Sequence, residues 1–89
     1  MSDIVRAFGL AVRQVRLSRG WSQEALAAQA ELNRSYVGEI ERGQVVASIV
    51  TVQKLAHALG VSTPDLLAQT DAIYRNLHAK AIQLTAIAC

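Results

Sequence analysis

The stretch SQEALAAQAELNRSYVGEIERG at residues 22–43 predicts two short helices joined by a tight turn. Ser22 can cap the first helix with its hydroxyl, and Asn33 can cap the second with its side-chain oxygen. Val37 and Ile40 lie three residues apart, so they share one face of the second helix and can pack against the first. Together these features predict a helix-turn-helix.

With Val37 and Ile40 facing inward, the other side of the second helix carries polar or small residues along its amino-terminal half. A helix of this width fits the major groove of DNA, where such residues reach base edges. The candidates for base contact are Arg34, Ser35, Gly38 and Glu39. Arg34 is the strongest, because its guanidinium fork matches two major-groove acceptors of guanine. Glu39 has three open interpretations: it accepts from a cytosine amine, orients Arg34, or lies in solvent.

Polar groups near the helix starts are candidates for holding the DNA backbone. Amide groups at the start of a helix bind phosphate, and hydroxyl or carboxamide side chains add hydrogen bonds. The candidates for phosphate contact are Ser22, Gln23, Tyr36 and Ser48. We therefore expect phosphate contacts to position the protein while base contacts read the sequence.

Residues 8–67 resemble the helix-turn-helix family of phage repressors and Cro-like regulators, the Cro/C1-type or XRE family. The resemblance lies in the segments FGLAVRQVRLSRGWSQEALA, NRSYVGEIERG and TVQKLAHALGVSTPDLL, which fix many residue types at fixed spacing. It implies an all-α, five-helix domain of the lambda-repressor type. It also implies sequence-specific transcriptional control, usually by a homodimer on a two-fold operator of double-stranded DNA. Whether the protein is a repressor or an activator stays open.

The same resemblance pairs Arg16 of the first helix with Glu41 near the end of the recognition helix. If the pair is partly buried, it locks the recognition helix against the scaffold, and loss of one partner costs about 3 kcal/mol or more. If the pair is exposed, it contributes about 1 kcal/mol or less.

Two features depart from the family pattern. Glu31 stands where relatives most often place glycine, so either this residue adopts a positive φ at a cost of about 1 kcal/mol or the turn adjusts. The loop GQVVAS at residues 43–48 offers Val45 and Val46, whose side chains cannot donate to phosphate, although backbone amides there can. Either phosphate anchoring is weaker, or these valines contact sugar edges or another subunit.

Three more helices are predicted around the motif. Ser2 or Asp3 can cap the first, which ends at Gly20; the fourth covers residues 48–59; and Ser62 with Asp65 forms a capping-box-like opening of the fifth. Apolar residues in these helices that are expected to contact the interior include Ile4, Ile49 and Leu67.

The extent of the resemblance divides the chain into a domain and an extension that lies beyond it. The helix-turn-helix DNA-binding domain spans residues 1–69, with the motif at 23–42 and the recognition helix at 34–42. Residues 70–89 form a C-terminal helical extension, in which apolar residues recur at helical spacing opposite basic and polar ones. We expect this extension to make a homodimer contact in preference to packing on its own domain or fraying.

Composition supports a small helical domain. The 89 residues suffice for one domain, and the alanine-rich 52% hydrophobic fraction with a single proline favours helices. The net charge of +2 is less basic than a non-specific nucleic-acid coat requires. The placement of the arginines therefore matters more than their number.

The sequence contains no recognisable cofactor or metal site. Cys89 is the single cysteine, so an internal disulfide and a cysteine zinc site are excluded, and a reducing cytoplasm fits. His57 and His78 each stand alone on predicted helices, which favours surface or interface roles over metal binding. No apolar run approaches the roughly 18 residues of a membrane span, and no signal-peptide pattern is present. A cytoplasmic location is expected.

Two other classes of function were considered. An enzyme would need a nucleophile with a base, paired acids or a phosphate loop, and none of these is found. The stronger rival is an antitoxin-like protein-interaction module that neutralises a partner and also regulates its own promoter. In that case the apolar loop and the C-terminal extension would bind the toxin. A surface for contacting polymerase cannot be identified in the sequence.

Overall fold

The computed structural model describes the backbone of residues 2–88 and the side chains of residues 2–78, and the backbone forms helices without any strand. This all-α architecture confirms the fold class predicted from the sequence. The elements in order are α1 (Asp3–Ser18), α2 (Gln23–Ala30), α3 (Arg34–Glu41), α4 (Ile49–Leu59) and α5 (Thr63–Ala88).

Short polar side chains cap four of the five helices, and the caps at Ser22, Asn33 and Ser62 confirm predicted ones. Each cap accepts a hydrogen bond from an amide of the first turn, which would otherwise have no intrahelical partner. The accepting and donating residues are Ser22 and Ala25, Asn33 and Ser35, Ser48 and Thr51, and Ser62 and Asp65. Helix α1 differs, because Ser2 occupies its cap position without a side-chain cap hydrogen bond.

Four helices end in a left-handed residue, and only one of these residues is not glycine. Glu31 follows α2 with φ of 56° and ψ of 45°. The Leu32 amide then donates back to the Ala27 carbonyl at 2.8 Å, which is the hydrogen bond of a Schellman motif. The turn therefore keeps the standard geometry, and Glu31 adopts the strained conformation.

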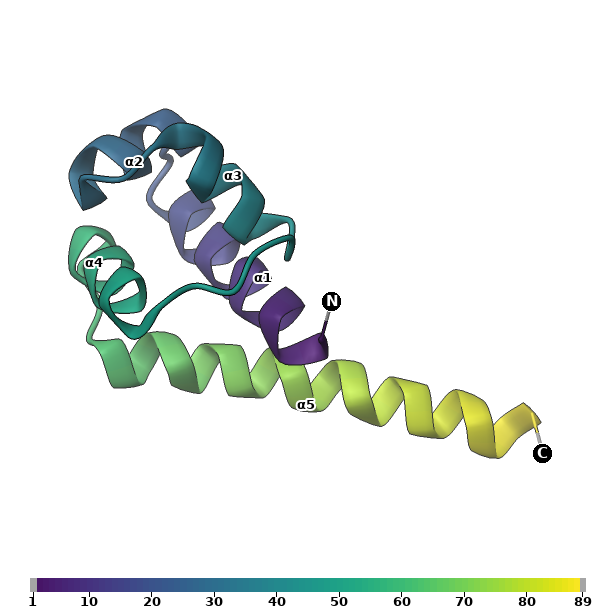
Figure 1. Cartoon of the computed structure of the whole chain (residues 1–89). Coiled ribbons are helices and arrows are strands. Elements are labelled where there is room, and N and C mark those ends of the chain that lie inside the picture. The colour runs from purple at the N-terminus through teal and green to yellow at the C-terminus, as the bar shows by residue number, and fades with distance from the viewer. Residues whose placement is uncertain (1, 89) are drawn as a thin grey trace.

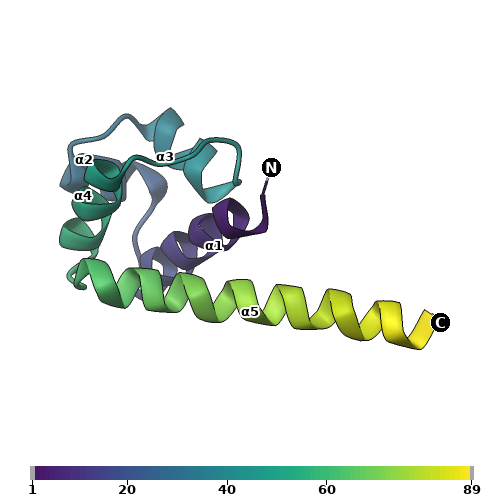
Figure 2. The same ribbon diagram turned by 60° about the horizontal axis from the view of Figure 1, so that its bottom comes forward.

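The five helices form a small orthogonal bundle with one long arm. Helix α3 packs against α1, α2 packs against α3 and α4, and α5 runs beneath α1 and α4 (Figure 1). After a turn of the view, α5 is seen to continue well past the body of the domain (Figure 2). The molecule accordingly measures 48 × 24 × 23 Å.

Helix α5 joins two segments that the sequence analysis treats separately. The predicted fifth helix and the predicted extension from residue 70 are one continuous helix. Thr70 is buried and Ile73 packs against the core, so the contact of α5 with the domain extends beyond residue 69. The apolar residues predicted to form one face of the extension beyond residue 78, and Cys89, lie outside the described side chains.

Three apolar residues predicted to face the interior are exposed instead. Ile4 is 45% exposed, Ile49 is 71% exposed and Leu67 is 41% exposed. Ile4 and Ile49 lie in the first turns of their helices, where no neighbouring element covers them. The interior is formed by residues from all five helices: Phe8, Ala11, Val12, Val15, Leu26, Ala27, Ala30, Val37, Ile40, Val52, Leu55, Ala56, Leu59 and Leu66.

His78 has a packing partner in the same helix. Its ring stacks on that of Tyr74, with centroids 6.0 Å apart and planes 7° from parallel.

In the described part of the chain, histidine, cysteine and acidic side chains form no group of three that could hold a metal ion. None of the helices combines the length and hydropathy needed to cross a membrane, within the residues described.

Replacing Glu31 with glycine should stabilise the domain. Glu31→Gly removes the Cβ that disfavours the left-handed conformation, a gain reduced by the greater freedom of glycine in the unfolded chain, so the free energy of unfolding should rise by about 0.5–1 kcal/mol. The matched reverse change is Gly60→Ala, which adds a Cβ to a residue with a positive φ of 74°. The nearest heavy atom of a non-adjacent residue to this Cβ is Arg19 Nη2 at 3.7 Å, so the change tests the backbone conformation without a steric clash. It should lower stability by about 1 kcal/mol. Urea denaturation measures the free energy of unfolding of both variants. A loss of stability in Glu31→Gly would contradict the claim that the left-handed conformation of Glu31 is strained.

Candidate nucleic-acid interface

A buried ion pair fixes the carboxyl end of α3 to α1. Arg16 Nε donates to Glu41 Oε2 at 2.6 Å, and Arg16 Nη2 donates to Glu41 Oε1 at 2.9 Å. Both residues are only 7% exposed. This two-pronged geometry confirms the predicted pair and places it in the buried case, where removal of one partner leaves an unpaired charge.

Neighbouring polar groups complete the hydrogen bonds of the pair. Arg16 Nη1 donates to the Trp21 carbonyl at 2.7 Å, and Gln23 Nε2 donates to Glu41 Oε1 at 3.1 Å. The hydrogen bond with Glu41 raises the pKa of Arg16 above its ordinary value. No buried side-chain nitrogen or oxygen in the described residues lacks a hydrogen-bond partner, so the charges are well compensated.

Gly9 sets the distance between α1 and α3. A Cβ at this position would lie 2.3 Å from the Ile40 carbonyl oxygen and 2.8 Å from that of Glu41. These are backbone atoms, so a larger residue would push the two helices apart. Gly9 and the Arg16–Glu41 pair therefore fix both the spacing and the rotation of α3.

The outward side of α3 forms a polar hollow of about 430 Å³. We call it the recognition hollow. Polar and charged groups from the start of α2, from α3 and from the loop that follows line it: Gln23, Arg34, Ser35, Gly38, Glu39, Arg42 and Gln44. All four predicted base-contact residues lie here, together with one of the predicted phosphate contacts.

The predicted base-contact residues differ in their surroundings. Arg34 is exposed, and its Nε lies 3.6 Å from Glu24 Oε1 of α2, so Glu24 is the carboxylate that approaches Arg34 in this structure. Ser35 is exposed and Glu39 is half-buried. Gly38, in contrast, is buried, because the side chains of Arg42 and Gln23 lie over it.

The predicted phosphate contacts form two groups. Ser22 and Gln23 lie at the start of α2, where the Ser22 hydroxyl accepts from an amide and keeps its hydrogen to donate. Tyr36 and Ser48 instead both contact Thr51: the Tyr36 hydroxyl oxygen lies 3.4 Å from Thr51 Oγ1, and Ser48 Oγ lies 3.1 Å from it. The Tyr36 contact is long, so a phosphate oxygen can compete for that hydroxyl.

Sequence reasoning missed three residues of this region. Arg42 and Gln44 line the recognition hollow, and Arg42 Nε donates to Gln44 Oε1 at 3.2 Å. The sequence did contain a signal for Arg42. It follows Gly38 by four residues and Arg34 by eight, and residues at this spacing lie on the same side of a helix. Gly9 gives no such signal, because its role depends on a helix that is distant in sequence.

Comparison with known proteins places this geometry in a family. A model described as helix-turn-helix matches residues 12–66, which include all of α2, α3 and α4. The chain belongs to the helix-turn-helix family. The match contains the buried pair and every residue of the recognition hollow.

Similar proteins cover most of this helix-turn-helix chain. Control protein C.BamHI of Bacillus amyloliquefaciens is 48% identical over 67 residues, which span 74% of this chain and 83% of that protein. The crystal structure of the restriction-modification controller protein C.AhdI from Aeromonas hydrophila matches with a TM-score of 0.69 and 45% identity, over 74% of this chain and 98% of that one. The crystal structure of the clp gene regulator ClgR from Corynebacterium glutamicum matches with a TM-score of 0.84 and 28% identity, over 94% of this chain and 88% of that one. The likeness to ClgR therefore extends into α5 beyond the family match.

Neutralising Glu41 should destabilise the domain strongly. Glu41→Gln keeps the size of the side chain but leaves the Arg16 charge buried without a counter-ion, so the free energy of unfolding should fall by about 3 kcal/mol. The matched control is Asp71→Asn, which breaks the exposed pair of Asp71 with Arg75 at 3.0 Å. It should cost less than about 1 kcal/mol. Urea denaturation at neutral pH measures both, and equal losses would show that the buried pair does not hold α3.

Proposed function

We propose that the protein is a sequence-specific regulator of transcription that inserts α3 into the major groove of double-stranded DNA. The observation that carries this proposal is the recognition hollow on the outward side of α3, where the guanidinium groups of Arg34 and Arg42 lie among carboxamide and hydroxyl groups. Arginine and carboxamide side chains match the donor and acceptor pattern of base edges. The buried pair holds this surface outward and meets it at Gln23, whose Nε2 donates to Glu41.

The contacts divide into reading and positioning. Arg34, Ser35 and Glu39 would face base edges, with Arg34 reading guanine through its fork. Ser22, Gln23 and the amides at the start of α2 would hold one phosphate, because a helix start favours an anion.

Relatives favour a regulator over a toxin-neutralising module. The similar proteins are named as control proteins and gene regulators. We infer that control of a restriction-modification system is the candidate setting, because C.AhdI is named as such a controller at 45% identity. DNA immediately upstream of the chain's own coding sequence is then the first candidate operator.

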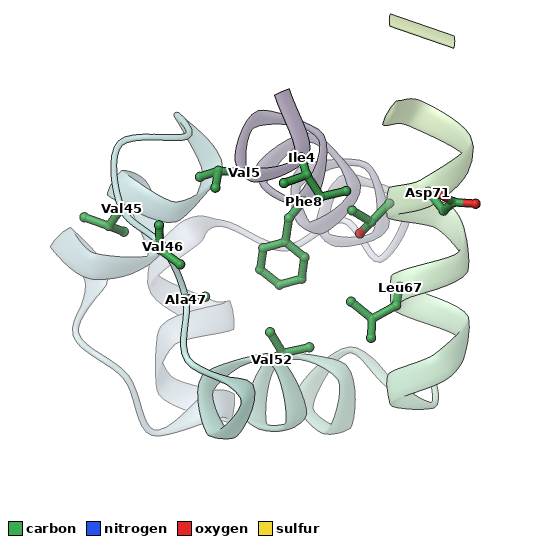
Figure 3. Close-up of a pocket in the computed structure, with 10 residues that line it drawn as sticks. Ile4, Val5, Phe8, Val45, Val46, Ala47, Val52, Leu67 and Asp71 are labelled. Carbon is green, nitrogen blue, oxygen red and sulfur yellow. The ribbon is translucent and has the colours of Figure 1, made fainter. Parts of the chain in front are cut away.

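The domain also carries an apolar face on the side of α4 and α5. We define the apolar face as two sets of exposed residues: Ile4, Val46 and Leu67, which line one groove, and Ile49 and Val50 at the start of α4, which line a second hollow with Gln53 and Thr63. Part of it surrounds a groove of about 340 Å³, in which the Phe8 ring lies between Val52 of α4 and Leu67 of α5 (Figure 3). Among the strongly exposed large apolar residues described, Leu17 of α1 lines neither of these two hollows. Exposed apolar surface gathered in this way marks a contact with another protein.

We infer that a second copy of this chain covers the apolar face. Along α5 the acidic residues Asp65 and Asp71 come before the basic residues Arg75 and Lys80. Two α5 helices that lie antiparallel would place the earlier, acidic positions of each near the later, basic positions of the other, which favours pairing with a copy. The expected dimer contact of residues 70–89 is part of this proposal. A two-fold dimer presents two recognition helices to an inverted repeat.

Selection from random duplexes tests the proposed function. The bound fraction should be enriched in an inverted repeat whose half-sites lie about one helical turn, roughly 34–36 Å, apart. If no sequence is enriched over an unrelated competitor duplex, sequence-specific regulation is contradicted.

On the selected duplex, Arg34→Ala should lower the ratio of specific to non-specific affinity by about tenfold, because the fork to guanine is lost. The control is Arg13→Ala, an exposed arginine of α1 outside the recognition hollow. Fluorescence anisotropy with specific and unrelated duplexes measures both ratios. An equal effect of the two changes would remove Arg34 from base reading.

Ile49→Glu should weaken the proposed dimer. A carboxylate in an apolar interface loses hydration without gaining a partner, so the dimer dissociation constant should rise by tenfold or more. The control is Leu17→Glu, since Leu17 is 56% exposed away from the apolar face. Sedimentation equilibrium measures both constants, and an unchanged constant in Ile49→Glu would contradict the apolar face as the dimer contact.

A chain ended after His78 tests the extension separately. This end point keeps Thr70 and Ile73, which belong to the packed domain. If the shortened chain has the same dimer dissociation constant as the full chain, the segment beyond residue 78 makes no dimer contact.

A further inference from the structure

Gly38 is a glycine inside the recognition helix, where it weakens the helix relative to alanine. Its backbone angle gives no reason for glycine, because its φ lies outside the left-handed range. No backbone of a neighbouring element approaches it as α3 approaches Gly9. The reason for a missing Cβ must therefore lie in the side chains around it.

Those side chains are Arg42 and Gln23. A Cβ on Gly38 would lie 2.9 Å from Arg42 Nη1 and 3.5 Å from Arg42 Nη2, and 3.4 Å from Gln23 Oε1. The Arg42 guanidinium thus lies across the middle of α3, although Arg42 itself follows the last residue of the helix. Glycine at this position leaves the space that the guanidinium occupies.

Two further contacts hold the neighbouring groups. Arg42 Nε donates to Gln44 Oε1 at 3.2 Å, so a residue of the loop after α3 also contacts the Arg42 side chain. Gln23 donates through Nε2 to Glu41, which ties its carboxamide to the buried pair. The Arg42 guanidinium therefore occupies the space above Gly38, beside a carboxamide that the scaffold holds.

We propose that Gly38 is a positioning residue that lets Arg42 lie across the recognition helix, where Arg42 acts as a second DNA-binding arginine beside Arg34. This inference rests on the proposed DNA-binding function and extends it to a residue at the end of α3. The group that Arg42 binds is an acceptor atom of DNA, either on a base edge or on a phosphate. These two sources differ in their effect on specificity and on salt dependence.

The space above Gly38 can be filled without disrupting the fold. The atoms that an added Cβ would meet most closely belong to the flexible end of Arg42, so this end can move away. Alanine is also the better helix former. Gly38→Ala should therefore unfold at the same temperature as the unaltered chain or higher, while the position of Arg42 changes.

A double-mutant cycle on the selected operator tests the coupling. Gly38→Ala and Arg42→Ala should each weaken specific binding by about tenfold, the effect of losing one good arginine contact. In the Arg42→Ala background, Gly38→Ala should have little further effect, because there is no guanidinium left to displace. Non-additivity of this size shows that the two residues act together.

Each outcome of the cycle decides the inference. If Arg42→Ala lowers the ratio of specific to non-specific DNA affinity, Arg42 contacts a base. If it instead reduces the slope of log affinity against log salt concentration by about one, Arg42 contacts a phosphate. If Gly38→Ala weakens binding equally in both backgrounds, the Cβ obstructs DNA directly and the positioning role is overturned. If Arg42→Ala binds like the unaltered chain, the DNA contact of Arg42 is overturned. Absence of specific binding by the unaltered chain would instead remove the proposed function, and this inference with it.

A measurement without DNA separates positioning from binding. In the free protein, the Nε–H resonance of Arg42 should shift in Gly38→Ala, because the guanidinium must leave its place over α3. The Arg34 resonance provides the internal control and should stay unchanged. An unchanged Arg42 resonance would contradict the positioning role whatever the binding data show.

Discussion

The buried ion pair between Arg16 and Glu41 is the constraint on which the candidate DNA-binding surface depends. Its favourable energy must offset the desolvation of two charges, so it tolerates little change in geometry. Both carboxylate oxygens are engaged by the guanidinium, which fixes the rotation of α3 about its own axis. Gly9 sets how closely α3 approaches α1. A helix of eight residues would be unstable alone, and its orientation is supplied by this attachment.

The attachment continues to the outer surface through one carboxamide. Gln23 donates to Glu41 on the buried side and lies beside Gly38 on the outer side. The scaffold and the recognition hollow therefore share a residue, and this residue also lies in the first turn of α2, where a phosphate is favoured. A disturbance of the buried pair should accordingly alter DNA binding as well as stability.

Local chemistry could be predicted from the sequence, whereas coverage by distant elements could not. The caps at Ser22, Asn33 and Ser62 follow from residue type and position and were predicted correctly, whereas the cap at Ser48 was missed because residue 48 was assigned to the fourth helix itself. Periodicity gives the apolar side of a helix but not whether another element covers it, which is why the exposure of Ile49 was missed. The close approach at Gly9 belongs to the tertiary structure and has no local signal.

The continuity of α5 could have been predicted, since no glycine or proline follows Pro64 before residue 88. The base-contact candidates were predicted as a helix face, and the structure gathers them in one hollow. Arg42 was missed although it lies within the predicted recognition helix, because the base-contact candidates were taken from its amino-terminal half, whereas the Arg42 guanidinium folds back toward Gly38.

The central claim is that DNA binds the outward side of α3 while the buried pair holds that helix in place. Titration of the ¹⁵N-labelled protein with its operator duplex, followed by backbone amide NMR, tests this claim most directly. The largest shifts are expected at residues of the recognition hollow and at the start of α2, with α1 near Gly9 keeping its resonances. Largest shifts on α1 or α5, with those of α3 unchanged, would contradict the claim.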